Sequence, residues 1–560
     1  MRQPVPVATS ASGWPIRRLL FCAFFCLVAA LQTACSKSEK NTAAPASSAA
    51  THAAPQVLRI SQRNEPADLD PATATLPDEF FILRALSEGL LVPDVANTNR
   101  GAPLPAAAER FTVSTDGLIY TFHLRPAATW SDGTPVTAAD FVATYRRALT
   151  PATAAPKAHL FYAVKNARAF LTGAVSDFSQ VGFAAPDAHT LVIMLAQPAP
   201  RFLHYVASGP WLPVNPRAVA QHGRTWTQPG HFIGNGPFVL TEWRQQQRIV
   251  VQKNPRYRAA ASIRLDEIQF LRFDSGDTEE RAYRAGQVDV TMSIPFTKIE
   301  TYTRDRAAEF HRAPAAETRF LSFNTTHTAL SDARVRRALS LAINRTQIVE
   351  RITRGGQLPA TTFAPPSLLD RDGSPSRPPS TPDVNTARDL LAAAGFAAGR
   401  GFPRLELTAW SQSQSPVLEA IQAMWRTELG IEVSLVIHEA KIHHAALASG
   451  TYDIAFATTA PLLDLADPLD LLANFTAIGA NNYPRWKNAD YEALLASATT
   501  TTDLVRQTTL LVSADSLLAA EAPVAPLYFN TRTWLMSPRV RDWREDPLWT
   551  RDYTAVHLAP

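Results

Sequence analysis

The stretch from residue 405 to 437 places the strictest constraint on the fold. Its apolar pattern predicts a strand over 405–410, a helix over 416–429 and a second strand over 431–437. A strand, a helix and a strand in succession form a βαβ unit, whose two strands pair in parallel through a right-handed crossover. The sequence therefore predicts an α/β fold.

Local patterns elsewhere agree with this fold class. Tyr120, Phe122 and Leu124 alternate with polar residues, which is the period of a half-buried strand. Thr137 and Asp140 have the spacing of a capping box and predict the start of a helix. Further strands are predicted over 191–195 and 248–252, and further helices from 331 or 332 onward and from about 386 to 395.

Length and charge narrow the class of protein. The chain has 560 residues, 46% of them apolar and 19% charged, which is too long for one core and predicts two or three lobes. The formal net charge is +4, but Arg2, Arg17 and Arg18 lie in the first 35 residues without any acidic residue. The rest of the chain carries 51 basic and 50 acidic residues. This balance disfavours a nucleic-acid-binding protein.

The first 35 residues have the pattern of an export signal. Arg17 and Arg18 precede a 13-residue apolar run, 19–31, which has signal-peptide length and is short for a membrane span. All three cysteines, at positions 22, 26 and 35, also fall in this segment. The remaining chain therefore offers neither a disulfide nor a cysteine metal site. We predict that residues 1–35 are a signal peptide and that the protein is exported.

The end of this segment, LQTAC at 31–35, resembles the lipobox of bacterial lipoproteins, in which a small residue precedes a diacylated cysteine. Ala34 and Cys35 fit, whereas Gln32 stands where an aliphatic residue is usual; cleavage by the ordinary signal peptidase is the alternative. Residues 36–55 contain almost no large apolar side chain and predict a flexible linker. The expected protein is periplasmic and tethered to the membrane by a lipid on Cys35.

A search for catalytic groups finds none that the sequence supports. Phosphate-loop and nucleophile-elbow motifs are absent from the sequence. The histidines at 438, 443 and 444 match a zinc-protease motif only superficially, because position i+4 from His438 is Ile442. Asp464 and Asp467 could form a carboxylate pair, but a solvated acidic loop is the commoner arrangement. The sequence predicts no catalytic residue, no metal and no cofactor.

A series of short motifs follows in order along the mature chain. Together they resemble the extracytoplasmic solute-binding proteins of ABC importers that capture oligopeptides, dipeptides and, in some members, nickel or haem. The most specific motif is TFHLR at 121–125 followed by WSDGTPVTAADF at 130–141. The other matching stretches are 65–71, 87–91, 235–238, 283–289, 332–339, 450–453 and 467–468.

This resemblance implies a periplasmic-binding-protein-like hinge fold of two α/β lobes with a third lobe inserted in the first. The ligand would bind between lobes I and III, which close by hinge rotation, and the closed protein would deliver it to a membrane permease. A monomer that binds an oligopeptide is expected. The implied segments are 56–90, 190–275 and 526–560 for lobe I, 91–189 for lobe II and 276–525 for lobe III.

The resemblance also assigns ligand-binding residues. Peptide-binding members pair the ligand backbone with strands of the protein, which places Thr75 and Leu76 on one side and Thr459, just before Asp464, on the other. Asp464 corresponds to the family aspartate that receives the α-ammonium group of the ligand. A turn cap before Pro468 is the structural alternative for this aspartate.

Other positions depart from the well-known oligopeptide receptors. Ala440, Leu447, Ala448 and Phe456 stand where those receptors have Trp, Arg, His and Arg. We therefore predict a site that includes Ala440 and Phe456, lacks a clamp for the terminal carboxylate, and accepts peptides that are longer, more apolar or C-terminally blocked. Two alternatives are a non-peptide ligand such as a metal chelate or haem, and a surface lipoprotein with hydrolase or chaperone-like activity. For the chelate or haem, the place to look is the set His438, His443 and His444.

Overall fold

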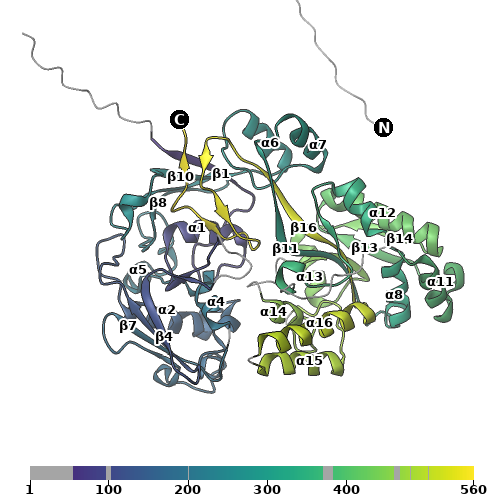
Figure 1. Cartoon of the computed structure of the whole chain (residues 1–560), viewed down its shortest axis with the longest axis horizontal. Helices are drawn as coiled ribbons and strands as arrows, with labels where there is room; N and C mark the ends of the chain where they lie inside the picture. The colour runs from purple at the N-terminus through teal and green to yellow at the C-terminus, as the bar shows by residue number, and fades with distance from the viewer. Residues whose placement is uncertain are drawn as a thin grey trace, which may run out of the picture. The chain divides into compact units, whose positions relative to one another are not determined.

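The computed structural model describes residues 55–95, 102–199, 201–369, 382–459, 467–479, 481–501 and 503–560 (Figure 1). The predicted signal peptide, Cys35 and all but the last residue of the predicted linker lie outside this part of the chain. Among the described residues, no helix combines the length and the apolar character needed to span a bilayer. Residues 55–560 cluster as one unit, in which three larger sheets each have their own core.

The first sheet has four strands in the order β1-β10-β9-β8. Strand β1 pairs with β10 in parallel, and the other neighbours are antiparallel. Helix α1 contributes Phe81, Ile82 and Leu86 to its core, which the C-terminal residues Val556 and Leu558 complete. The elements are β1 (Val57–Gln62), α1 (Pro77–Leu86), β8 (Phe238–Arg244), β9 (Arg248–Lys253) and β10 (Glu267–Arg272).

The second sheet is antiparallel, with the order β4-β5-β7-β6. The predicted alternation and capping box are both confirmed, since β5 covers Ile119–Leu124 and α2 begins after Thr137 with Asp140 bonded to the Thr137 backbone N–H. Its core contains the buried indoles of Trp130 and Trp211. The remaining elements are β4 (Ala108–Val113), β6 (Phe183–Ala184), β7 (Thr190–Met194), α2 (Ala138–Leu149), α3 (Ala167–Leu171), α4 (Phe202–Val206) and α5 (Pro216–His222).

The third sheet has six strands, β12-β16-β11-β15-β13-β14. The predicted βαβ unit is confirmed, because β13 and β14 pair in parallel on either side of α12, and β13 pairs in parallel with β15 as well. Helix α12 continues as a wide turn, Trp425–Leu429, and ends where Gly430 adopts a φ of +69°. The strands are β11 (Phe310–Phe323), β12 (Leu358–Pro359), β13 (Leu405–Ala409), β14 (Val433–Ile437), β15 (Ile454–Thr458) and β16 (Val524–Leu535).

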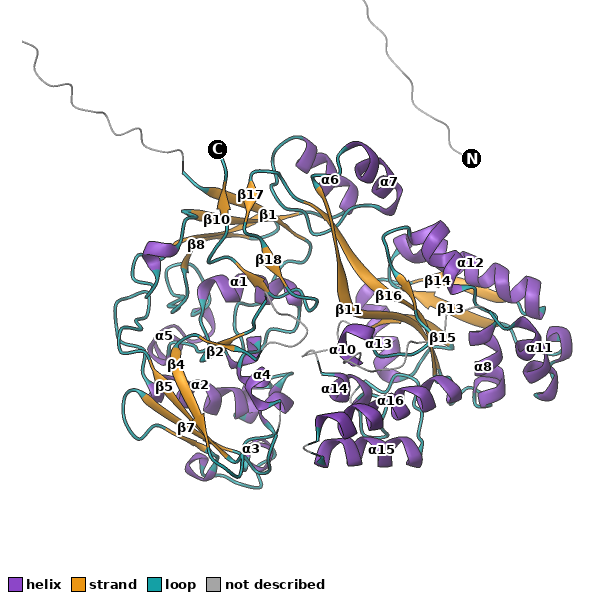
Figure 2. Ribbon diagram, in the orientation of Figure 1, coloured by secondary structure: helices purple, strands orange, loops and turns teal. Residues whose placement is uncertain are grey.

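Helices cover both faces of the third sheet (Figure 2). Successive residues of β11 point to opposite faces, so Leu321 joins the core with α8, α11 and α12, while Phe320 joins the core with α14, α15 and α16. These helices are α8 (Ala333–Leu341), α11 (Val384–Ala393), α12 (Ser415–Met424), α14 (Pro468–Ala473), α15 (Ala489–Thr500) and α16 (Leu504–Glu521). The others are α6 (Gly276–Arg284), α7 (Phe296–Asp305), α9 (Arg345–Gln347), α10 (Pro366–Leu369) and α13 (Ala440–Ser449).

Strands β11 and β16 link the first and third sheets (Figure 1). They run antiparallel to each other, with a register shift between Pro314 and Thr318. At one end Trp534 of β16 packs into the first core, and at the other end Leu527 packs into the third. Two backbone connections between separate cores are the arrangement that a hinge requires.

The sheets divide the chain differently from the predicted lobe boundaries at two places. The boundary predicted at residue 190 falls at the start of β7, which pairs with β5 and therefore belongs to the second sheet. The boundary predicted at 526 falls inside β16, most of which pairs with β11 in the third sheet. The assignment of three lobes itself stays a prediction.

Candidate functional site

The carboxyl ends of β13, β14 and β15 lie at one edge of the third sheet because the three strands run in parallel. Trp410, His438 and Thr459 follow directly after them. In open α/β sheets, ligands bind outside the carboxyl ends of the parallel strands. We therefore take this carboxyl edge as the starting point for the candidate site.

A charged pair from β11 lies at the carboxyl edge. Register places Arg319 directly opposite Thr458, the last residue of β15. The Arg319 Nη2 is 2.8 Å from a carboxylate oxygen of Glu317, and its guanidinium lies 5.6 Å from the centre of the Trp410 ring. Glu317 is buried and accepts hydrogen bonds from the Asn530 amide, at 2.8 Å, and from the Thr458 hydroxyl. This buried carboxylate holds the guanidinium in place, while 21% of the Arg319 side chain stays exposed.

Helix α13 brings a buried histidine to the same edge. The ring of His443 lies 5.4 Å from that of Trp410, and its Nε2 is 2.9 Å from the carbonyl oxygen of Phe456. Burial lowers the pKa of His443 to about 4, so the ring is neutral near pH 7 and Nε2 carries the hydrogen that it donates. Its Nδ1 is buried without a hydrogen-bond partner in the described part of the chain. His443 thus packs at the carboxyl edge as a neutral, buried side chain.

The histidines were also the predicted place for a metal chelate or haem. Within the described ranges, no group of three or more His, Cys, Asp or Glu side chains is arranged to hold a metal ion. His438, His443 and His444 therefore do not form a metal centre by themselves.

The predicted contacts on β15 and α13 differ in their exposure. Phe456 is 1% exposed and packs against Trp410, with ring centres 5.5 Å apart and ring planes at 38° to each other. Thr459 is fully buried; its N–H donates to the Thr318 carbonyl at 3.1 Å, and its hydroxyl accepts from the Thr318 N–H at 2.9 Å. Ala440, the first residue of α13, is half-buried. Direct contact of these three residues with a ligand stays a prediction. In this structure Phe456 and Thr459 are buried beneath the protein surface.

Thr75 and Leu76, predicted to pair with a ligand backbone, are exposed and precede α1. Their N–H groups already donate to the Glu79 carboxylate, at 2.7 and 2.9 Å, and the Leu76 carbonyl accepts from the Glu79 N–H at 3.2 Å. Pairing with a ligand through these N–H groups would therefore require Glu79 to release them. Sequence reasoning missed this competitor, although Glu79 stands three residues after Leu76, which is the capping-box spacing.

Asp464 lies outside the described residues, and the structure next describes Asp467. Asp467 caps α14 through the Leu469 N–H at 2.9 Å and accepts the Nε of Arg201 at 3.1 Å. One turn later, Asp470 accepts the Tyr205 hydroxyl at 3.0 Å. Burial and then the Asp470 carboxylate raise the pKa of Tyr205 well above its ordinary value, so its hydroxyl remains a donor.

These two interactions form the α4–α14 contact. Helix α4 is anchored in the second core by Phe202, whereas α14 is anchored by Leu471 in the core beneath the third sheet. The contact therefore joins two separate cores through polar side chains, directly after the segment that contains Asp464.

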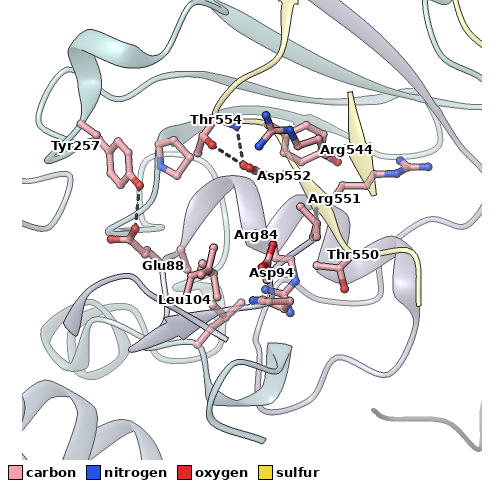
Figure 3. Close-up of a pocket in the computed structure, with 18 of the residues that line it drawn as sticks. Arg84, Glu88, Asp94, Leu104, Tyr257, Arg544, Thr550, Arg551, Asp552 and Thr554 are labelled. Carbon is pink, nitrogen blue, oxygen red and sulfur yellow. Dashed lines mark hydrogen bonds between the residues drawn. The ribbon is translucent and has the colours of Figure 1, made fainter. Parts of the chain in front are cut away.

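A separate cavity of about 270 Å³ lies in the first-sheet region (Figure 3). Glu88 accepts the Tyr257 hydroxyl at 2.9 Å and the Arg258 Nε at 2.9 Å, and Asp552 accepts from Thr554. Within this cavity, Glu88 thus forms an ion pair with Arg258, whereas Asp552 is bonded to the neighbouring Thr554. Its walls come from the end of α1, the 257–262 loop and the short C-terminal strands β18 (Arg544–Glu545) and β19 (Arg551–Asp552).

Comparisons with known proteins cover nearly the whole described chain. Residues 102–483 match the family described as bacterial extracellular solute-binding proteins, family 5 middle. The chain is 32% identical to the periplasmic murein peptide-binding protein MppA of Escherichia coli over 86% of its own length and 89% of the relative. The solved structure of MppA superposes with a TM-score of 0.80 and 31% identity, covering 91% of this chain and 99% of the other.

Two further relatives differ in the ligand that their names state. The probable deoxycholate-binding periplasmic protein YgiS of E. coli is 32% identical over 87% of this chain and 90% of its own. The structure of Haemophilus influenzae OppA in complex with the peptide RPPGFSPFR superposes with a TM-score of 0.78 and 25% identity, covering 90% of this chain and 99% of the other.

Proposed function

Because the chain belongs to the bacterial extracellular solute-binding proteins of family 5, we propose that it captures oligopeptides for an ABC importer and delivers them to a membrane permease. The observation that carries this proposal is the match over 90% of the chain to a structure solved with a bound peptide. Members of the family are binding proteins, and we propose that this chain likewise performs capture without a catalytic step or a cofactor.

The proposed binding cycle uses the two linking strands as a hinge. In the open form, a peptide would enter between Thr75 and Leu76 on one side and the carboxyl edge of the third sheet on the other. Asp464 would accept the α-ammonium group of the peptide in a charge-assisted hydrogen bond. Closure would bring α4 and α14 together, and the Arg201–Asp467 and Tyr205–Asp470 interactions support a closed form of this kind.

Export and tethering complete the proposal. Residues 1–35 would direct the chain across the inner membrane, and a lipid on Cys35 would anchor the mature protein through the linker 36–55. The protein would then act as a periplasmic monomer beside its permease. Mass spectrometry of the mature N-terminus tests the anchor: a diacylated cysteine is expected, and an unmodified N-terminus elsewhere would contradict it.

Calorimetry with a matched peptide pair tests the proposed anchor at Asp464. A peptide with a free amino terminus is expected to bind more tightly than its N-acetylated twin, and Asp464→Asn should remove most of that difference. Equal affinity of the wild type for both peptides would exclude Asp464 as the ammonium anchor.

A second candidate function is the capture of a non-peptide ligand. The specific observation in its favour is the 32% identity to the probable deoxycholate-binding protein, which equals the identity to MppA. Competition separates the two candidates. Deoxycholate that binds at micromolar concentration and is not displaced by any peptide would favour the second.

A further inference from the structure

Arg319 has unused hydrogen-bonding capacity at the carboxyl edge. A guanidinium carries five N–H donors. Among the residues that the structure describes, the only carboxylate near Arg319 is that of Glu317, which faces Nη2, and no hydrogen bond from Nε or Nη1 to protein is found. The side chain is nevertheless held in place, by Glu317 on one edge and by the Trp410 ring on one face. Arg319 is therefore a positioned cation with N–H groups that remain available to a ligand.

Arg319 lies near Phe456, one of the positions at which the sequence predicts that a cationic side chain is missing. Phe456 stands where oligopeptide receptors have an arginine, and Leu321 of β11 lies directly opposite it. Arg319 is two residues before Leu321 on the same strand, so both side chains point to the same face as Phe456. Strand β11 therefore presents a guanidinium on the face of the sheet where β15 carries Phe456.

The local chemistry favours an anion as the partner of these donors. A planar guanidinium recognises a carboxylate through two parallel N–H groups, and such charge-assisted bonds are the stronger ones in proteins. Glu317 uses its remaining lone pairs for Asn530 and Thr458, so its own charge is already shared among three partners. In the part of the chain that the structure describes, no second carboxylate pairs with the opposite edge of the Arg319 guanidinium, which is therefore available to a ligand carboxylate.

We propose that Arg319 binds a carboxylate of the captured ligand and thereby determines specificity for acidic or C-terminally free ligands. This inference rests on the proposed function and names the chemical group that the site selects. It differs from the sequence-based expectation of a site without a carboxylate clamp, and the experiment below decides between the two. The carboxylate can come from the C-terminus of a peptide or from an Asp or Glu side chain, and the experiment must separate these two sources.

The test uses synthetic pentapeptide pools incubated with the full mature protein, with retained peptides identified by mass spectrometry and their affinities measured by calorimetry. One pool has free C-termini and no Asp or Glu, the second has C-terminal amides with Asp and Glu, and the third has C-terminal amides without them. The wild type is expected to bind the best carboxylate-bearing peptides roughly tenfold more tightly than matched uncharged amides. Enrichment from the first or from the second pool identifies the source of the carboxylate.

Arg319→Gln is expected to lose this preference, so that carboxylate-bearing peptides and matched uncharged amides bind to it with similar affinity. Arg319→Lys should restore part of the preference, because it keeps the charge without the planar fork. Arg334→Gln is the matched control, since Arg334 is an exposed arginine paired with Asp332 on α8.

Three results would overturn the proposal. A wild-type protein that binds peptides without any carboxylate preference, or an Arg319→Gln variant that keeps the preference, rejects Arg319 alone and leaves peptide capture intact. Failure of all three pools to bind the wild type rejects peptide capture and this inference together.

Discussion

Each linking strand carries an arginine that pairs with a glutamate, but the two arginines differ in their exposure to solvent. Arg532 of β16 is 5% exposed, pairs with Glu545, and lies over the rings of Trp534 and Trp549 at 5.3 and 4.7 Å. Arg319 of β11 is 21% exposed, pairs with Glu317, and lies 5.6 Å from the centre of the Trp410 ring. The first guanidinium is enclosed by protein, and the second has one open edge.

Both acidic partners are buried, but they differ in the number of guanidinium groups with which they pair. Glu545 pairs with both Arg532 and Arg551, and all three side chains are nearly inaccessible. Burial alone would raise the pKa of Glu545, but the two guanidinium groups outweigh it and hold the pKa below its ordinary value. This closed network ties the C-terminal hairpin to a linking strand. The difference teaches that the Arg532 pair serves structure, whereas the Arg319 pair is poised for a ligand.

The largest effect is expected at the enclosed pair. Glu545→Gln removes the carboxylate that pairs with two buried guanidinium groups, which is expected to cost about 3–5 kcal/mol of unfolding free energy. Denaturation with urea, followed by circular dichroism, measures this loss. A cost below about 1 kcal/mol would mean that water or another carboxylate replaces Glu545, and the contrast between the two pairs would disappear.

The second largest effect on stability is expected from His443, which lies at the carboxyl edge near Trp410. His443 has a pKa of about 4 when folded and near 6.5 when unfolded, so between these values the unfolded chain binds more protons. Stability is therefore expected to fall as the pH drops from 6.5 to 4, by on the order of 2 kcal/mol from this residue. In His443→Leu this contribution should vanish. Parallel stability curves for the variant and the wild type over that range would contradict the burial of a neutral ring.

Arg319→Gln makes the matching change in the Arg319–Glu317 pair. It is expected to lower the unfolding free energy by about 1 kcal/mol, which is less than Glu545→Gln. Glu317 keeps Asn530 and Thr458 as hydrogen-bond donors, and the lost cation is partly solvated. The urea experiment described for Glu545→Gln provides the comparison. Equal losses for the two variants would show that Arg319 is as structural as Arg532.

The smallest effect is expected at the α4–α14 contact. Tyr205→Phe removes one hydrogen bond to Asp470, worth about 1 kcal/mol, and should weaken ligand binding roughly fivefold if the contact stabilises the closed form. Tyr162→Phe is the control, since Tyr162 is 37% exposed. An unchanged ligand affinity in Tyr205→Phe would show that this contact does not stabilise the closed form.

Sequence patterns predict well where a feature depends on near neighbours in the chain. The period of 405–437 predicts β13, α12 and β14, and the Thr137–Asp140 spacing predicts the start of α2; the structure confirms both. The Arg319–Trp410 contact could not be predicted, because it depends on the register between strands that are far apart in sequence. The occupied N–H groups of Thr75 and Leu76 were missed because Leu76 is not a typical capping residue.

The central claim is that this chain captures peptides, and the ligand that co-purifies with it tests that claim most directly. The mature protein should be isolated without denaturant and examined by native mass spectrometry, followed by release and sequencing of whatever is bound. We expect a mass excess that resolves into short peptides on release. A bound species that contains no peptide, such as a steroid acid or a metal chelate, would contradict it.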